Sequence, residues 1–223
     1  MKVGTDAVVL GCLAPISPST KRILDIGTGS GVIALMLAQR CKQATVIGIE
    51  IDEAASKQAQ VNFEASIYAE QLIGFHQSLQ NYAVSSSIKF DLIVSNPPFF
   101  EQGKNASISD SARSLARQDG SLSFSDLAKH ATMLLASTGS FCIILPVQEA
   151  RLFGIEAVLN GLHLTHEIAI IPRHGKAANR LVQVYQFMVH QLVQTEITLK
   201  DENGSASEEY IQLSKEFYLR IDQ

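Results

Sequence analysis

The chain alternates short apolar runs with longer segments that have helical periodicity. Apolar runs without regular polar positions are typical of strands that are buried on both faces of a parallel sheet. The expected strands are one ending at Asp25 or Ile26, then 44–49, Leu72–His76, 90–94 and 140–145. The expected helices are 7–14, Val32–Arg40, 53–66, 123–136 and 148–160. This order predicts an α/β fold with helices on both faces of a mostly parallel sheet.

The pattern changes in the last third of the chain. Residues 163–171 and 181–189 read as adjacent strands of a hairpin, and Thr138 with Gly139 reads as the turn into the fifth strand. After Leu192 come a polar, acidic stretch and an amphipathic helix that reaches about Phe217. We therefore predict one domain over 1–192, with 193–223 as a peripheral extension of it.

Composition narrows the class of protein. The 223 residues are 46% hydrophobic, enough for one sizeable core. The formal net charge is -4, so any contact with nucleic acid needs a local basic patch. Cys12, Cys41 and Cys142 lie in apolar neighbourhoods and read as reduced thiols of a cytoplasmic protein. We expect no signal peptide, no membrane span and no metal site, because neither the apolar runs nor the histidine and cysteine spacings fit one.

A glycine-rich turn follows the first strand. Asp25 precedes three alternating glycines, Gly27, Gly29 and Gly31, which permit a tight turn and close approach of a ligand. Val32 stands where the dinucleotide fingerprint needs a small residue, and Asp25 repels phosphate. Asp25 is suited instead to a ligand's ammonium group, directly or through water. The turn therefore predicts an S-adenosylmethionine site.

The next two strand ends add further candidates for this site. Glu50 ends the second strand about 20 residues past the turn, the spacing expected for a carboxylate that binds ribose hydroxyls. Ile51 follows Glu50, and Ser78 lies just after the third strand, where an adenine edge would be. We count Glu50, Ile51, Ser78 and the N-terminal Thr5 as cofactor-binding residues. Asp52 reads as a helix cap.

The fourth strand leads into Asn96-Pro97-Pro98-Phe99. Two prolines end the strand and stiffen the loop at the carboxyl edge of the sheet. The Asn96 side chain and the Pro97 carbonyl can each accept a hydrogen bond, and the ring of Phe99 offers a flat apolar face for stacking. Such a loop holds a planar group that carries an NH2, either the exocyclic amine of adenine or the side-chain amide of glutamine. We assign Asn96, Pro97, Pro98 and Phe99 as the catalytic loop.

Basic residues occur in two segments that can reach this edge. Lys104, Arg113 and Arg117 lie in the polar stretch after the catalytic loop. Arg173, Lys176 and Arg180 lie in the linker of the C-terminal hairpin, the most basic part of the chain. They could contact phosphates of a substrate RNA, or they could be ordinary solvated charges.

The ordered set of Asp25 with the glycines, Glu50 and Asn96 resembles that of Rossmann-like methyltransferases, which depend on S-adenosylmethionine and, with this loop, act on amino nitrogens. We expect its central sheet to be mostly parallel and seven-stranded, with an antiparallel last strand.

Four motifs together resemble the bacterial tRNA1(Val) adenine-N6 methyltransferase family. They are Gly4-Thr5-Asp6 after Met-Lys-Val, the glycine turn, Asn96-Pro-Pro-Phe99, and Glu216-Phe-Tyr-Leu219. The resemblance implies methylation of N6 of an unpaired adenosine beside the anticodon, with tRNA as partner and a monomeric enzyme. Phe99 stands where the family has tyrosine, which keeps stacking and loses a hydroxyl. Family members usually carry a further leader before Met-Lys-Val, and we expect RNA binding to depend on it.

Two other readings share parts of this pattern. Protein glutamine-N5 methyltransferases use the same Asn-Pro-Pro-aromatic loop, but they place a helical recognition domain before the glycine turn. A non-catalytic module that binds S-adenosylmethionine is the third reading, and the intact loop from Asn96 to Phe99 argues against it.

Overall fold

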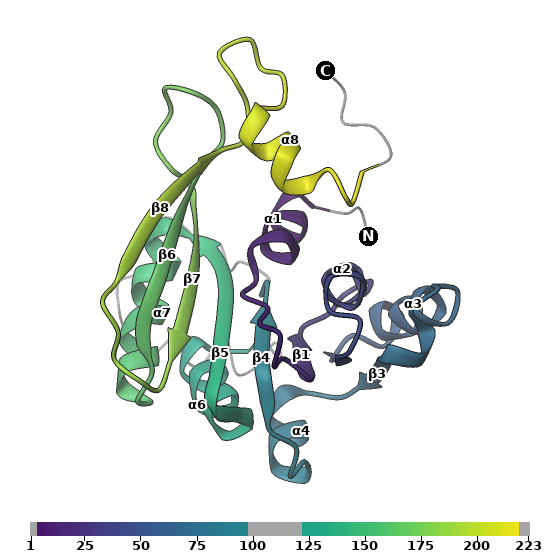
Figure 1. Ribbon diagram of the computed structural model, residues 1–223. Coiled ribbons are helices and arrows are strands. Elements are labelled where there is room, and N and C mark those ends of the chain that lie inside the picture. The colour runs from purple at the N-terminus through teal and green to yellow at the C-terminus, as the bar shows by residue number, and fades with distance from the viewer. Residues whose placement is uncertain (1–3, 98–121, 219–223) are drawn as a thin grey trace.

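The computed structural model describes residues 4–97 and 122–218, which fold around one eight-stranded sheet (Figure 1). The strand order is β3-β2-β1-β4-β5-β7-β6-β8. The strands are β1 (Arg22–Ile26), β2 (Thr45–Glu50), β3 (Leu72–His76), β4 (Phe90–Ser95), β5 (Leu135–Pro146), β6 (His163–Ile171), β7 (Arg180–Gln186) and β8 (Val193–Thr198). Strands β1 to β5 are parallel, and β7 runs antiparallel to both of its neighbours.

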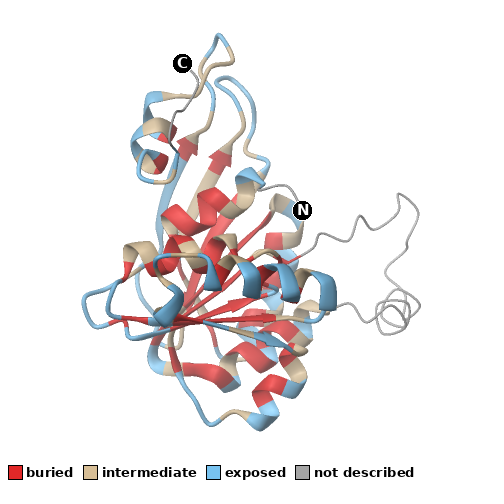
Figure 2. Cartoon of the chain, turned by 90° about the vertical axis from the view of Figure 1, so that its right-hand side faces the viewer, coloured by how far each residue is buried: buried red, intermediate tan, exposed pale blue. Residues whose placement is uncertain are grey.

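Helices cover both faces of the sheet and bury a hydrophobic core on each. The helices are α1 (Thr5–Leu13), α2 (Val32–Arg40), α3 (Glu53–Glu64), the short η1 (Ala69–Gln71), α4 (Leu79–Ser85), α6 (Phe124–Leu134), α7 (Val147–Leu159) and α8 (Glu208–Ser214). Apolar side chains of α1, α2, α3 and α8 pack on one face, and those of α4, α6 and α7 pack on the other. The central strands are buried along most of their length, as Figure 2 shows. The predicted fold class is therefore confirmed.

The sheet has eight strands, whereas we expected seven. The additional strand β8 pairs parallel with β6 and lies in the segment that we read as a peripheral extension. Its sequence Val-Gln-Thr-Glu-Ile-Thr buries only Ile197, because β8 is an edge strand. Polar residues at most of its positions leave no apolar run, and the hydrophobic pattern therefore does not reveal this strand.

Strand β5 also begins earlier than expected. The predicted turn at Thr138 and Gly139 is instead part of β5, where the pairing with β4 shifts between Phe90 and Leu92. A Cβ at Gly139 would lie 2.7 Å from the Phe90 carbonyl oxygen. Glycine is needed there because two backbones approach closely at an irregularity in the sheet, and not because the chain turns.

Candidate active site

The register of the parallel strands brings the predicted site to one edge of the sheet. Ile26, the last residue of β1, lies between Ile49 of β2 and Ser95 of β4. The residues that follow these three are Gly27, Glu50 and Asn96. Backbone N–H groups of Gly27 and Thr28 donate to the Ile49 carbonyl at 2.9 and 3.0 Å, which fixes the start of the glycine turn on β2.

All three glycines of the turn adopt positive φ, at 70° for Gly27, 58° for Gly29 and 85° for Gly31. A Cβ at Gly31 would lie 2.4 Å from the Phe63 ring of α3, whereas a Cβ at Gly27 would meet nothing within 4 Å. Gly31 is therefore needed for packing, and Gly27 leaves open space beside the backbone. The Asn62 side chain of α3 also donates to the Ser30 carbonyl at 2.7 Å.

Asp25 is completely buried beneath this turn. Its Oδ2 accepts a hydrogen bond from the Thr28 hydroxyl at 2.6 Å, while its Oδ1 has no hydrogen-bond partner. Burial raises the pKa of the Asp25 carboxyl to about 7, the Thr28 hydrogen bond and the nearby backbone N–H of Ala34 lower it, and the Glu50 charge raises it further. A buried oxygen without a partner is costly unless a ligand or water supplies a donor.

Glu50 is held by backbone donors on both carboxylate oxygens. Oε2 accepts from Gly29 N at 2.9 Å, and Oε1 accepts from Ile51 N at 2.9 Å and Asp52 N at 3.0 Å. Glu50 thus connects the glycine turn to the end of β2. These donors fix its position and leave capacity on Oε2 for a ligand hydroxyl.

The other predicted cofactor residues border the same edge. Ile51 is 56% exposed, and its carbonyl is 3.0 Å from Nε2 of His76. Ser78 caps α4, accepting from Asn81 N at 3.2 Å, and α4 itself was not predicted. Asp52 caps α3 as predicted, accepting from Ala55 N at 2.7 Å.

The start of the catalytic loop is anchored to β1. The Ser95 hydroxyl is buried and donates to the Ile26 carbonyl at 3.0 Å. Asn96 is half-buried and Pro97 is buried. The remaining predicted residues of this region lie outside the described residues. They are Pro98, Phe99, Lys104, Arg113 and Arg117.

Helix α1 reaches the same edge through an ion pair. Gly4 caps α1 without a side-chain bond, so Asp6 does not serve as the cap. Asp6 instead accepts from Arg180 Nε at 2.9 Å, and Arg180 pairs with Pro146 at the carboxyl end of β5. Thr5 begins α1 and is exposed.

The basic linker between β6 and β7 contacts the loop after β8. Arg173 donates to the Glu202 carbonyl, and His174 lies 3.3 Å from the Glu202 carboxylate. Lys176 is exposed. Part of the linker charge is therefore balanced, because Arg180 pairs with Asp6.

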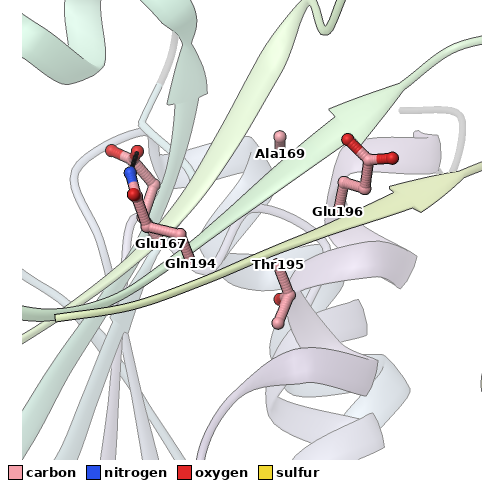
Figure 3. Close-up of a pocket in the computed structure, with 5 residues that line it drawn as sticks. All are labelled: Glu167, Ala169, Gln194, Thr195 and Glu196. Atoms are coloured by element: carbon pink, nitrogen blue, oxygen red, sulfur yellow. Dashed lines mark hydrogen bonds between the residues drawn. The ribbon is translucent and has the colours of Figure 1, made fainter.

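A separate hollow with a volume of about 360 Å³ lies on β6 and β8, which are four and five strands away from β1. It is lined by Glu167, Ala169, Gln194, Thr195 and Glu196 (Figure 3). Glu167 accepts from the Gln194 amide at 2.9 Å and from the Gln183 amide at 2.8 Å. These hydrogen bonds connect β6, β7 and β8. The hollow is therefore a feature of this edge of the sheet and does not belong to the predicted site.

Comparison with known proteins identifies the family. The family model described as "Methyltransferase small domain" matches residues 3–150. Relatives from Bacteroides fragilis (strain ATCC 25285) and Aeromonas salmonicida (strain A449) are 37% and 39% identical over 222 residues. Each alignment covers 99% of this chain and 92% of the relative, and both relatives are named tRNA1(Val) (adenine(37)-N6)-methyltransferase. The chain belongs to the tRNA1(Val) (adenine(37)-N6)-methyltransferase family.

Solved structures agree with this family at the level of the fold. A predicted O-methyltransferase, Atu636 from Agrobacterium tumefaciens, has a TM-score of 0.70 at 18% identity and covers 95% of this chain and 96% of its own. TrmN from Thermus thermophilus has a TM-score of 0.59 at 22% identity and covers 82% and 48%. The resemblance read from the sequence is confirmed, while the individual site residues remain predictions.

The site fits the cofactor of the tRNA1(Val) methyltransferase family, S-adenosylmethionine. The unpartnered Oδ1 of Asp25 suits an ammonium group, and the open space beside Gly27 lets a ligand approach the backbone. Among the described residues, no group of three or more metal-ligating side chains is present. None of the helices in the described ranges is long and apolar enough to cross a membrane.

Thr28 and Asn62 were missed as parts of this site by the sequence analysis. For Thr28 a signal existed, because a hydroxyl three residues after a buried acid at a turn is well placed to bond it. Asn62 carries no such signal, since its contact with Ser30 spans 32 positions.

Gly27→Ala is expected to weaken cofactor binding more than it weakens the fold. The positive φ should cost about 1–2 kcal/mol of stability, and the new methyl group enters the space open to a ligand. Gly161→Ala is the matched control, because Gly161 has φ 80° and open space but lies before β6 at the opposite edge. Urea unfolding and calorimetry should show similar stability losses, with reduced affinity only for Gly27→Ala. If Gly27→Ala and Gly161→Ala bind the cofactor with equal affinity, Gly27 is not part of the site.

Proposed function

We propose that this chain transfers a methyl group from S-adenosylmethionine to the exocyclic N6 of an unpaired adenosine in tRNA, next to the anticodon. The observation that carries the proposal is the register that places Asn96 beside the glycine turn and Glu50 at one sheet edge. The names of the relatives supply the substrate class, adenine 37 of tRNA1(Val). The same proposal includes a cytoplasmic, monomeric enzyme.

In this proposal Glu50 binds the ribose hydroxyls, and the carboxylate of Asp25 binds the ammonium group. Gly27, Gly29 and Gly31 let the cofactor lie against the backbone. Thr5 at the start of α1, Ile51 after β2 and Ser78 before α4 complete the proposed cofactor site. When bound, the cofactor supplies an electrophilic methyl carbon on a sulfonium.

The catalytic loop orients the target amine. The amine of adenine is a poor nucleophile, because its lone pair is delocalised into the ring. The Asn96 side chain and the Pro97 carbonyl accept its two hydrogens, which favours a pyramidal nitrogen with its lone pair directed at the methyl carbon. Phe99 stacks on the base. Positioning and preorganised dipoles supply most of the acceleration in this scheme, without a strong base.

The direct test is methyl transfer from labelled S-adenosylmethionine to bulk tRNA and, separately, to a peptide release factor. We expect label in tRNA, recovered as N6-methyladenosine after nuclease digestion. Label in glutamine of the release factor would favour the glutamine-N5 alternative. Binding of the cofactor without transfer to either substrate would favour the non-catalytic reading.

We also propose that the linker residues form, with Lys104, Arg113 and Arg117, a basic rim for tRNA phosphates. Phosphate contacts give affinity without sequence information, while the adenine pocket selects the base. Among the basic residues that the structure describes, Arg173 and Lys176 are the strongest candidates for phosphate contacts. Both lie in an exposed linker at the carboxyl edge, and neither is in an ion pair within the part of the chain that the structure describes. Arg180 has a structural ion pair with Asp6, so its replacement would also disturb α1.

Replacing Arg173 and Lys176 together by glutamine should flatten the salt dependence of tRNA binding. Each lost phosphate contact reduces the log-log slope by about 0.7, so the expected decrease is about 1.4. The matched control is Lys21→Gln with Lys42→Gln, two exposed lysines before β1 and β2 at the opposite edge. The measurement is tRNA affinity across a salt series. If both double variants keep the original slope, the linker does not bind RNA.

A further inference from the structure

Asp25 is a buried carboxylate with one satisfied and one unsatisfied oxygen. The side chain is 0% exposed, its Oδ2 accepts from the Thr28 hydroxyl at 2.6 Å, and its Oδ1 has no partner. The Thr28 hydroxyl thus binds one of the two oxygens and leaves the other for a further donor.

The position of the Thr28 hydroxyl is closely constrained. Thr28 is 7% exposed, and its backbone N–H donates to the Ile49 carbonyl at 3.0 Å. A Cβ added at Gly48 would lie 2.9 Å from Thr28 Oγ1 and 3.0 Å from both Thr28 Cβ and Cγ2. The side chain of Thr28 thus occupies the space above Gly48. Because the backbone and the packing both fix Thr28, its hydroxyl faces Oδ2 of Asp25 consistently.

Few charged groups face this carboxyl from the elements around it. Glu50 on β2 is the charged group that influences Asp25, and it has the same sign. The only charge on α2 is Arg40 in its last turn, which donates to the Gly11 and Ala14 carbonyls. On α1 the charge is Asp6, in the ion pair with Arg180, and Asp91 on β4 binds the backbone of Lys21 and Arg22.

The charge of Asp25 therefore depends on donors next to its carboxyl group. Burial, reinforced by the Glu50 charge, raises the pKa of the carboxyl to about 7, while the Thr28 hydroxyl, and after it the backbone N–H of Ala34 in the first turn of α2, act in the opposite direction. A hydroxyl that donates to the ionised form favours that form. Above that pKa the carboxylate is charged and can attract a cation, and below it the attraction is lost.

We propose that Thr28 is a positioning residue for the cofactor: its hydroxyl holds Oδ2 of Asp25, keeps the carboxylate charged, and leaves Oδ1 to the cofactor's ammonium group. The inference rests on the proposed cofactor but not on the proposed transfer to tRNA. It predicts that affinity for the amino-acid part of the cofactor depends on pH near neutrality, and that Thr28 sets this dependence.

The test uses calorimetry from about pH 6 to about pH 9 with two probes. S-adenosylhomocysteine keeps the ammonium group, and 5′-methylthioadenosine lacks it. Affinity for S-adenosylhomocysteine should rise with pH along an acid limb, which reports the ionisation of Asp25, and then level off. The α-amino group of this free amino acid lies next to a carboxylate and stays protonated through most of the range. Affinity for 5′-methylthioadenosine should lack the acid limb.

Thr28→Val removes the donor at nearly constant shape, and Thr28→Ser keeps it. In Thr28→Val the acid limb should move up by about one pH unit or more, which lowers affinity near pH 7 by about fivefold or more. Thr28→Ser should follow the wild-type profile, and 5′-methylthioadenosine should bind all three proteins alike. An unmoved acid limb in Thr28→Val overturns the inference. The inference is also overturned if Thr28→Val loses as much affinity for 5′-methylthioadenosine as for S-adenosylhomocysteine, because this would show that the threonine only shapes the site.

Asp25→Asn is the second variant, and it decides the matter if Thr28→Val does not fold. It should bind S-adenosylhomocysteine weakly and without an acid limb, while its affinity for 5′-methylthioadenosine is unchanged. An acid limb that persists in Asp25→Asn overturns the inference. These readouts involve no methyl transfer. A chain that failed to methylate tRNA would contradict the proposed function alone, and an unmoved limb would contradict the inference alone.

Discussion

Asn96→Ala is expected to lower the rate of methyl transfer to tRNA by roughly 10²–10³-fold, the usual cost of removing one preorganised polar group from a reacting centre. The reason is that the amine would keep only one of its two acceptors, the Pro97 carbonyl, so its lone pair would no longer be fixed. The fold should tolerate this change. Asn96 is only half-buried, and the end of β4 is held independently by the Ser95 hydroxyl on Ile26. Single-turnover rates on bound tRNA measure the effect.

Two further variants make the result specific to Asn96. Asn81→Ala is the matched control, because Asn81 is an exposed asparagine on α4 whose cap contact uses only its backbone N–H. It should leave the rate unchanged. Asn96→Asp keeps an acceptor of the same shape and should lose less than the alanine variant. If a folded Asn96→Ala enzyme transfers the methyl group to tRNA at an undiminished rate, the proposed role of the loop is wrong.

Glu50→Ala should weaken S-adenosylmethionine binding by about 1.5–3 kcal/mol, or roughly 10–100-fold. The substitution removes the proposed ribose contacts. It also releases the backbone N–H groups of Gly29, Ile51 and Asp52, which all donate to this carboxylate. The glycine turn therefore loses its connection to the end of β2 in the same step. Calorimetry gives the affinity directly.

Asp52→Ala is the control for charge and location, because Asp52 is two residues from Glu50 on the same loop. Asp52 caps α3, so its loss should cost about 1 kcal/mol of stability and leave cofactor affinity nearly unchanged. Glu50→Gln keeps one oxygen acceptor and should fall between wild type and alanine. Unchanged affinity in Glu50→Ala would exclude this carboxylate from the site.

The sequence predicted those elements whose boundaries are set locally. Helix α2 and strands β3 and β6 have the predicted bounds, because a glycine turn or a change of apolar pattern marks their ends. Strand β8 was missed, since it has almost no buried side chains. The β5 irregularity at Gly139 was misread as a turn, because the sequence does not show the approach of Phe90.

The candidate site was predictable in outline and not in its bonding. Strand-end residues could be aligned because parallel strands place their carboxyl ends at one edge. The donors to Glu50 and the contact of Asn62 with the turn depend on distances between separate elements, which no spacing rule provides. The same holds for Arg180, which we expected at an RNA surface and which forms an ion pair with Asp6.

The Asp6–Arg180 ion pair has a consequence for synthesis on the ribosome. The two residues are 174 positions apart, so α1 is made long before β7. At translation rates of about 5–20 residues per second, Asp6 remains without Arg180 for roughly 10–35 s. Helix α1 can pack on α2 soon after both are made, but its contact with α8 must wait for the end of the chain. Val8, which lies in a cluster with Leu213 and Phe217, therefore stays without these two apolar neighbours until the last residues emerge.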